Sequence, residues 1–273
     1  MPSTRTVKSG GFLLTRQAKK DIYKLMRIAA IYDIHANLNA LESVLEIIEK
    51  NQVDSIVVGG DVVSGPLPNE VLSVLRRNNV TTHYILGNAE SDVLRYLAGH
   101  EINGMSERAN EEARWVASVL TDSNKQFLSS WQSTIEVEVR GLGSVLFCHG
   151  TPRSNVEIFT STTSEEKLLP LFAGLSTSLV VCGHTHIQFD RKINGIRVVN
   201  AGSVGMPFGH RGADWILIDS EVAFKHTEYD YDAAAKRILE SNYSHAEEFV
   251  FSNILASPSE EKMLAMMKRM ELT

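Results

Sequence analysis

The stretch "MRIAAIYDIHANLNALESVLEIIEKNQVDSIVVGGD", residues 26–61, is the part of the sequence that most clearly indicates the fold class. Its first ten residues contain an apolar run typical of a buried strand, and its last nine contain another. The segment between them places apolar residues at helical spacing, namely Leu38, Leu41, Val44, Leu45 and Ile48. A strand, a helix and a second strand in this order predict a βαβ unit with parallel strands.

The rest of the chain continues in the same manner. We expect a helix over residues 70–77, a strand over 82–88, a helix over 106–131, a hairpin over 134–150, a helix over 164–172, a strand over 179–186 and further strands to residue 230. From Asp232 onward the pattern is helical, is broken at Pro258 and ends in a methionine-rich segment. We therefore expect an α/β protein with one domain over residues 26–230 and a helical tail over 231–273, packed on the domain or at a subunit contact.

Composition narrows the possible functions. The net charge of -6 argues against binding to a nucleic-acid backbone, although a small anionic substrate remains possible near a metal. The apolar runs fall far short of the roughly 20 residues that span a bilayer, so we expect no membrane segment. Cys148 and Cys182 each end an apolar run and are expected to be buried, which fits a reducing cytoplasm.

Residues 1–25 differ from the rest of the chain. They carry six Lys and Arg residues against the single acid Asp21. They lack the continuous apolar core of a secretory signal. We expect a basic, non-essential extension.

Potential metal ligands follow the apolar runs that we expect to be strands. These residues are Asp33, His35, Asp61, Asn88, His149, His184 and His186. Ligands of α/β sheets bind at the carboxyl ends of the strands, so these side chains are expected to meet. A lone Asp there is usually a helix N-cap, but N-caps do not explain imidazoles that follow two different strands. The other five histidines have no such neighbours in the sequence.

The size and chemistry of this set predict two metal ions. Seven ligands are too many for one tetrahedral ion and suit two ions that share a carboxylate. Nitrogen and oxygen ligands without thiolate favour Mn, Fe, Zn, Co or Ni over Ca, and we favour Mn. If His184 and His186 are in an extended segment they point the same way, whereas in a turn after Gly183 they can diverge toward two ions.

At these residues the sequence resembles the calcineurin-like metallophosphoesterases. Five blocks of that family occur in order as "DIH", "GGD", "GN", "CHG" and "GHTH". The resemblance is closest to the small bacterial branch named for phosphodiesterase or diadenosine-tetraphosphatase activity, through "DIHANLNALESVLE", "GDVVSGPLPNEV", "HGTPRS" and "VVNAGSVGMP". It extends over about residues 26–230. It implies a four-layer αββα sandwich with two mixed sheets and the metals at the sheet edge.

The resemblance also implies roles for the seven residues. Asp33, His35 and His186 would bind one metal, Asn88, His149 and His184 the other, and Asp61 would bridge them. A hydroxide that bridges the two ions would attack phosphorus, so Asp61, Asn88 and His149 would act through that hydroxide. Asn200 and Ser203, in "NAGSVG", would support the turn that carries His184 and His186.

The sequence departs from the family pattern after Asn88. Many relatives have a His there that serves as proton donor or phosphate contact, whereas this chain has Ala89 followed by Glu90. A methyl group cannot donate a proton, so poor leaving groups are expected to react slowly. Glu90 or His210 could substitute as the donor. Arg153 and Arg211 could bind a phosphate, and both could equally be surface arginines without a special role.

These observations predict a dinuclear-metal phosphoesterase that acts on small phosphate esters, with phosphodiesters favoured and nucleotides among the candidates. One alternative is a phosphomonoesterase, including a protein phosphatase. Another is a non-catalytic metal-binding scaffold for protein contacts, which the absence of the His keeps open. A homo-oligomer is possible.

Overall fold

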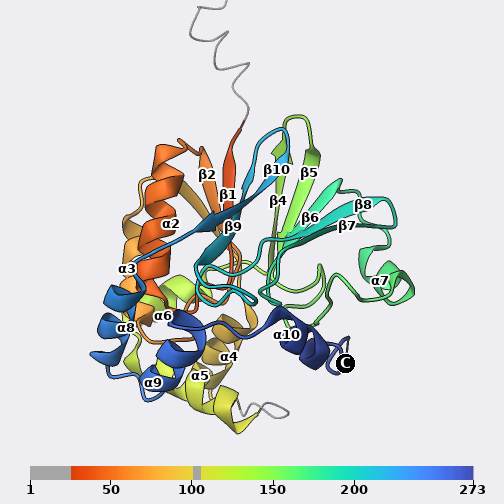
Figure 1. Cartoon of the computed structure of the whole chain (residues 1–273). Coiled ribbons are helices and arrows are strands. Elements are labelled where there is room, and N and C mark those ends of the chain that lie inside the picture. The colour runs from red at the N-terminus through yellow and green to blue at the C-terminus, as the bar shows by residue number, and fades with distance from the viewer. Residues whose placement is uncertain (1–25, 101–105, 273) are drawn as a thin grey trace, which may run out of the picture.

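The computed structural model describes residues 26–100 and 106–272 of the 273-residue chain. The predicted extension over residues 1–25 lies outside the described residues. Ten strands form two mixed sheets of five strands each (Figure 1). The strands are β1 (Ile28–Ile31), β2 (Ser55–Val58), β3 (Thr81–Tyr84), β4 (Thr134–Val139), β5 (Gly143–Cys148), β6 (Leu179–Cys182), β7 (Phe189–Ile193), β8 (Ile196–Asn200), β9 (Ala213–Ile218) and β10 (Val222–Thr227).

Helices join and cover these strands. They are α2 (Leu38–Lys50), α3 (Pro68–Arg77), α4 (Asn88–Leu97), α5 (Glu107–Val119), α6 (Asp122–Ser129), α7 (Glu165–Phe172), α8 (Tyr231–Leu239), α9 (Ala246–Phe249) and α10 (Glu260–Met267), with a π-helical turn η1 (Val250–Ile254) after α9. Helix α2 begins where the Asn37 side chain accepts a hydrogen bond from the Ala40 N–H. Helix α3 begins with Pro68, a residue whose fixed φ suits the first turn.

The two sheets differ in strand order. The first has the order β10-β9-β1-β2-β3, in which β1, β2 and β3 are parallel and β9 and β10 extend the sheet in antiparallel fashion. The second has the order β4-β5-β6-β8-β7, with a parallel centre and antiparallel edges. The predicted βαβ unit over residues 26–61 is thus confirmed as β1, α2 and β2.

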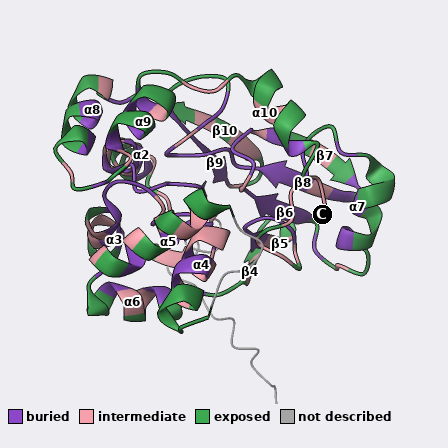
Figure 2. Cartoon of the chain, turned by 90° about the horizontal axis from the view of Figure 1, so that it is seen from below, coloured by how far each residue is buried: buried purple, intermediate pink, exposed green. Residues whose placement is uncertain are grey.

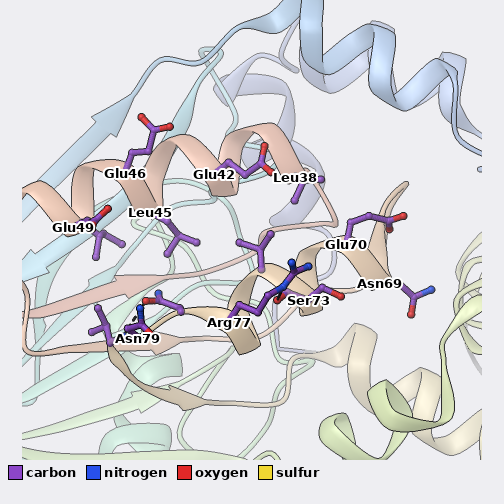
Figure 3. A pocket seen from close by; sticks show the side chains of 14 residues that line it. Leu38, Glu42, Leu45, Glu46, Glu49, Asn69, Glu70, Ser73, Arg77 and Asn79 are labelled. Atoms are coloured by element: carbon purple, nitrogen blue, oxygen red, sulfur yellow. Dashed lines mark hydrogen bonds between the residues drawn. The ribbon is translucent and has the colours of Figure 1, made fainter.

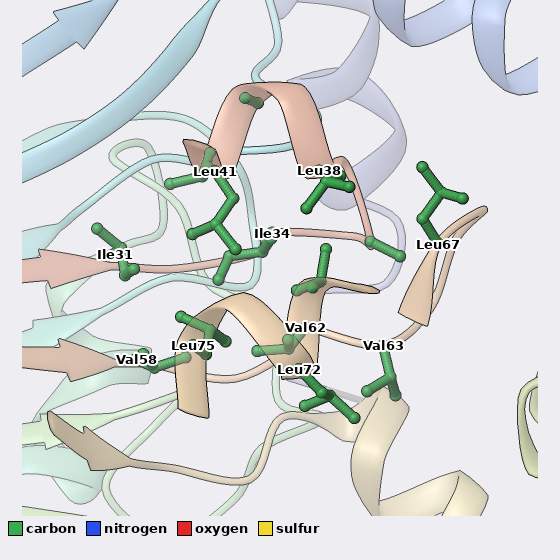
Figure 4. Packing of buried hydrophobic residues seen from close by; sticks show 14 of the residues in the cluster. Ile31, Ile34, Leu38, Leu41, Val58, Val62, Val63, Leu67, Leu72 and Leu75 are labelled. Atoms are coloured by element: carbon green, nitrogen blue, oxygen red, sulfur yellow. The ribbon is translucent and has the colours of Figure 1, made fainter. Parts of the chain in front are cut away.

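The sheets pack face to face, and helices cover their outer faces. One buried cluster lies between the sheets. It contains Val57 of β2 and Tyr32, which follows β1, together with Phe147 and Val181 of the second sheet. On the outer face of the first sheet, α2 and α3 bury their apolar stripes against β1 and β2 (Figure 4). Helix α7 packs on the outer face of the second sheet. The four-layer α/β sandwich is confirmed, and Figure 2 shows strands such as β6 and β9 buried, while the edge strands β4 and β10 are partly exposed and the helices expose their outer faces.

Three expectations about helices and strands were wrong in detail. The strand expected over residues 179–186 ends at Cys182 as β6. Residues 106–131 form two helices rather than one, because the Thr121 side chain caps a new helix by accepting a hydrogen bond from the Asn124 N–H. Strand β3 ends at Tyr84, and Asn88 begins helix α4 instead of ending the strand. The first turn of α4, and not the end of β3, therefore positions Asn88.

The helical tail packs on the rest of the molecule. Ile238, Phe249 and Ile254 join the cluster on the outer face of the first sheet. Met267 of α10 is buried against Ile187 and Phe208, whereas Met266 and Met270 are largely exposed. Both cysteines are free and buried, and burial raises the pKa of Cys148 to about 12. No helix in the described part of the chain is long and apolar enough to cross a membrane.

Candidate metal centre

The seven predicted ligands lie in loops or at a helix start at one edge of the two sheets. Asp33 and His35 follow β1, Asp61 follows β2, and Asn88 begins α4. In the second sheet, His149 follows β5, and His184 and His186 follow β6. The carboxyl ends of parallel strands share one edge, so both sheets deliver ligands to the same place.

The side chains form two groups of ligand atoms, each within 4.8 Å of one another: Asp33, His35 and His186, and Asp61, His149 and His184. His35 Nε2 lies 3.1 Å from His186 Nε2. Two ligand atoms that each lie about 2.1 Å from a shared ion stand about 3 to 3.5 Å apart, so this spacing fits a metal between them.

The second group has similar spacing and touches the first. His149 Nε2 lies 3.2 Å from His184 Nδ1, 3.1 Å from the Asn88 side-chain amide and 3.5 Å from Asp61 Oδ1. It also lies 3.9 Å from Asp33 Oδ1, which belongs to the first group. The two groups are therefore neighbours. The structure brings together all seven residues that the sequence singled out, and their binding of metal stays a proposal.

Backbone carbonyl groups fix the orientation of three imidazoles. The Nδ1–H groups of His35, His149 and His186 point to the carbonyl oxygens of Ser64, Gly59 and Met206, at 3.1, 2.8 and 2.9 Å respectively. In a neutral imidazole, a nitrogen that donates in this way leaves the other nitrogen with a lone pair. Each Nε2 is thereby prepared to bind a cation at the centre of its group.

The backbone at the site is strained. Nine described residues other than glycine have positive φ, and five of them are predicted ligands, namely Asp33, His35, Asp61, His184 and His186. A left-handed conformation costs of order 1 kcal/mol or more for such residues and persists only where the surroundings enforce it. His184 and His186 lie in the turn that Gly183 permits and diverge into different groups, as the turn alternative predicted.

The glycines of the motifs allow the strand ends to approach one another. A Cβ on Gly87 would lie 2.2 Å from Asp61 Oδ1, and a Cβ on Gly183 would lie 2.4 Å from Asp33 Oδ2. Neither position can accept a side chain without moving a predicted ligand. Asn200 supports the turn that carries His184 and His186, as predicted, since its Nδ2 donates to the Gly183 carbonyl at 2.6 Å. Ser203 instead supports the loop after β1, where its Oγ donates to the Asp33 carbonyl at 2.7 Å.

The unpaired atoms of the site fit metal ions. Three buried side-chain polar atoms in the described ranges have no hydrogen-bond partner, and two of them, Asp33 Oδ1 and His184 Nε2, belong to this site. A buried polar atom without a partner costs about 1 to 3 kcal/mol, so proteins rarely retain one without a use. Asp33 and Asp61 are moreover two buried carboxylates that a cation would neutralise.

The protonation equilibria of the site agree with this interpretation. Burial alone lowers the pKa of His149, but Asp61 and Asp33 outweigh burial and raise it to about 10. Burial together with the charge of His149 lowers the pKa of His184 to about 4. The carboxylates thus hold a proton on His149, in the place where a divalent ion would supply positive charge. Metal binding at such sites releases protons.

Glu90 lies behind the site. Its carboxylate accepts hydrogen bonds from the N–H groups of Asp61, Val62, Val63 and Gly87, at 2.8, 2.7, 3.1 and 2.9 Å. Burial and the nearby Asp61 raise its pKa to about 7 against the effect of these bonds. Both oxygens are occupied by backbone donors, so the structure favours a positioning role for Glu90 over the proton donation suggested from the sequence.

The remaining predicted contacts are engaged elsewhere. His210 Nε2 lies 2.9 Å from Asp214, which also contacts His226. The Arg153 guanidinium donates to Glu157 at 2.9 Å, and that of Arg211 stacks on the Tyr231 ring at 4.3 Å from its centre. None of the three belongs to the two ligand groups.

A cavity of about 870 Å³ between α2 and α3 is a poor alternative site (Figure 3). Glu42, Glu46, Glu49 and Glu70 line it, with Arg77 as the single Lys or Arg among the lining residues. None of the predicted ligands reaches it. Its acidic lining would repel a phosphate ester.

A double sheet that brings Asp and His groups suited to metal ions to one edge is the architecture implied by the resemblance to metallophosphoesterases. The chain belongs to the calcineurin-like phosphoesterase superfamily, whose domain model matches residues 26–222.

Other proteins are similar to this chain in sequence or in fold. An uncharacterized protein of Methanocaldococcus jannaschii is 28% identical over 237 residues, which make up 78% of this chain and 92% of the relative. A hypothetical protein from Pyrococcus horikoshii has a crystal structure with a TM-score of 0.71 at 18% identity, covering 83% of this chain and 98% of that one. A metallophosphoesterase from Sphaerobacter thermophilus has a TM-score of 0.65 at 24% identity, covering 85% and 99%. These two structures share the fold.

Proposed function

We propose that this protein hydrolyses phosphodiesters with two divalent metal ions, of which Mn²⁺ is favoured, and with water as the nucleophile. The observation that supports this most is the pair of adjacent ligand groups, in which buried Asp33 Oδ1 and His184 Nε2 have no hydrogen-bond partner; the nearest imidazole to Asp33 Oδ1 is that of His186, whose Nε2 lies 3.4 Å away. In this proposal Asp33, His35 and His186 hold one ion, Asn88, His149 and His184 hold the other, and Asp61 holds both. When bound, the ions lower the pKa of water and attract the phosphate oxygens.

The chain's own residues prepare the site for an anionic substrate. Asp33 and Asp61 bring two negative charges to a site that would hold four positive charges from two ions. An excess of positive charge remains for the phosphate, even though the chain carries a net charge of -6. The carbonyl contacts of His35, His149 and His186 keep the imidazoles turned toward the centre, so little reorganisation is needed on binding.

Ala89 limits the proton chemistry available at the leaving group. Its backbone N–H donates to Asp61 Oδ1 at 2.9 Å, but its methyl side chain has no proton to give. General acid catalysis contributes about 10²- to 10⁴-fold, and the esters that depend on it least are aryl esters with good leaving groups. Aryl phosphates are therefore the suitable substrates for a first assay.

The experiment compares hydrolysis of bis-(p-nitrophenyl) phosphate and p-nitrophenyl phosphate by metal-stripped protein, with and without added Mn²⁺. We expect turnover that requires the metal and is faster with the diester. The metal content of each sample is measured in parallel, so that inactive protein can be distinguished from protein without metal.

Each other result has a defined meaning. Faster metal-dependent hydrolysis of the monoester would replace the proposal with a phosphomonoesterase. Absence of turnover on either ester, in protein that holds its metals, would make Ala89 a disabling change and favour a binding scaffold.

A further inference from the structure

A cavity of about 300 Å³ lies directly beside the first ligand group. His35 itself lines the cavity. Ser64 and Met206 line it as well, and their carbonyl groups are the ones that orient His35 and His186. His35 thus belongs both to the first ligand group and to the wall of this cavity.

The opposite walls come from two segments far apart in the sequence. One is the start of α5, with Ser106, Arg108 and Glu112. The other is the helical tail, with Phe249 of α9 and with Ser252 and Asn253 of the π-helical turn η1. The α9–η1 segment lies beyond residues 26–222, which the family model matches. This wall is therefore specific to the part of the chain outside the common domain. Isolated π-helical turns occur frequently at functional sites.

The charges on these walls disfavour an anionic substituent. Glu112 and Glu248 supply two carboxylates, and Arg108 supplies one guanidinium group. Arg108 is already occupied, since its Nη2 lies 3.0 Å from Glu248 and its Nη1 lies 2.7 Å from His245 Nδ1. Glu112 accepts a hydrogen bond from the Tyr243 hydroxyl at 2.7 Å. No cation among these lining residues remains unpaired for a second phosphate group.

The other lining groups suit hydroxyl groups and an apolar face. Ser64, Ser106, Ser252 and Asn253 offer hydroxyl and amide groups that can both donate and accept hydrogen bonds. Met206 and Phe249 offer apolar contact. A space of this size is at the small end of ligand-binding cavities, which run from about 300 to 1,000 Å³.

From this geometry we infer that the cavity between α5 and the α9–η1 segment is the subsite for one ester substituent, and that it takes a small, uncharged, hydroxyl-bearing group of the sugar or nucleoside class. The inference rests on the proposed function. It adds that the tail, and not only the common domain, selects the substrate.

The test uses p-nitrophenyl phosphodiesters that share one leaving group. The second substituent is methyl in the first, thymidin-5′-yl in the second, and thymidin-5′-yl with a 3′-phosphate in the third. For the wild-type protein with Mn²⁺ we expect kcat/KM for the thymidine ester to exceed that of the methyl ester by about tenfold or more, and the added 3′-phosphate to remove that advantage.

A variant with a bulky side chain tests whether the preference for the thymidine ester arises in this cavity. Ser252 is exposed, so Ser252→Trp can fill the cavity without disturbing the core. We expect it to lower kcat/KM for the thymidine ester about tenfold and to change that of the methyl ester less than about twofold. The matched control is Ser118→Trp on the exposed side of α5, which does not line the cavity and is expected to leave both values unchanged.

The outcomes separate the subsite from the chemistry. If no ester is hydrolysed in the presence of Mn²⁺, the proposed function fails and the inference fails with it. Metal-dependent hydrolysis of the methyl and thymidine esters at equal rates, with no effect of Ser252→Trp, would overturn the subsite alone. Preference for the 3′-phosphorylated ester would overturn the uncharged class of substituent.

Discussion

Two clusters in this molecule contain the same kinds of residue, yet they are built differently. The first is the candidate metal centre described above, for which metal binding is proposed and which is called the metal centre below. The second, the His210–Asp214–His226 cluster, also brings its ligand atoms within 4.8 Å of one another. Residue type and proximity therefore do not distinguish the two clusters.

The hydrogen bonding of the two clusters differs. In the His210–Asp214–His226 cluster, both oxygens of Asp214 have imidazole partners at 2.9 Å. His226 Nε2 lies 3.3 Å from Glu228, and the His210 side chain is 51% exposed, so water can reach its other nitrogen. In the metal centre, by contrast, buried Asp33 Oδ1 and His184 Nε2 have no hydrogen-bond partner. One cluster is satisfied by its own residues, and the other is incomplete without a further ligand.

The backbone conformations of the two clusters also differ. Five predicted ligands of the metal centre have positive φ, whereas His210, Asp214 and His226 do not. His226 and Asp214 are simply opposite residues of the antiparallel strands β10 and β9. Strain at one cluster and regular strand pairing at the other suggest that only the first has been shaped to hold ions. We expect no ion at the second.

The largest expected effect comes from Asp61→Asn. A neutral amide cannot serve two ions as a carboxylate does, so the loss of activity is expected to exceed the roughly 100-fold typical of residues that only support a ligand. The measurement is kcat on bis-(p-nitrophenyl) phosphate together with the number of metal ions per chain. Retention of both ions and of full activity would refute the bridging role.

A smaller effect is expected from Glu90→Gln. In the wild type, the Glu90 carboxylate accepts hydrogen bonds from backbone N–H groups of the Asp61 loop. The amide of Gln would place its own N–H group against some of these donors, so those hydrogen bonds would be lost. The loop should loosen, and metal affinity is expected to fall about 10- to 100-fold while the chain still folds. Titration of Mn²⁺ into stripped protein measures this change.

The exposed Glu46→Gln on α2 is the matched control, because it removes the same charge far from the site. An unchanged affinity for Mn²⁺ in Glu90→Gln would mean that the four backbone bonds do not position Asp61. A donor role for Glu90 in catalysis would instead lower kcat without changing the affinity for the metal.

The metal centre could be predicted from the sequence to a large extent. Asp33, Asp61 and His149 each follow an apolar run, and the ends of parallel strands must share an edge, so their meeting required no knowledge of side-chain contacts. The α/β class and the βαβ unit followed from the same alternation of strands and helices. The resemblance to a known family added the second sheet and the assignment of ligands to each ion.

What could not be predicted depends on contacts between distant parts of the chain. Glu90 supports a loop 27 to 29 residues before it, and no periodicity marks that contact. The pairing of His226 with Asp214 depends on the register of β9 and β10, so this neighbour of His226 could not be recognised from the sequence. The cavity wall at Ser252 depends on how the tail folds back beside α5. Such contacts depend on tertiary packing rather than on local pattern.

The smallest effect is expected from His226→Gln, and this variant tests most directly whether the two clusters differ in metal binding. His226→Gln keeps a side-chain N–H that can donate to Asp214 but removes an imidazole ligand. If the His210–Asp214–His226 cluster binds no ion, the variant should hold as many metal ions per chain as the wild type and retain activity within about twofold, like other exposed substitutions. Its thermal stabilisation by Mn²⁺ should also match that of the wild type, because a ligand stabilises only through the sites that it occupies. Metal analysis and thermal unfolding with and without Mn²⁺ measure both quantities. Loss of one ion per chain in His226→Gln would show that exposed, mutually satisfied imidazoles can still recruit a metal, and that unpaired buried atoms are not the feature that separates the two clusters.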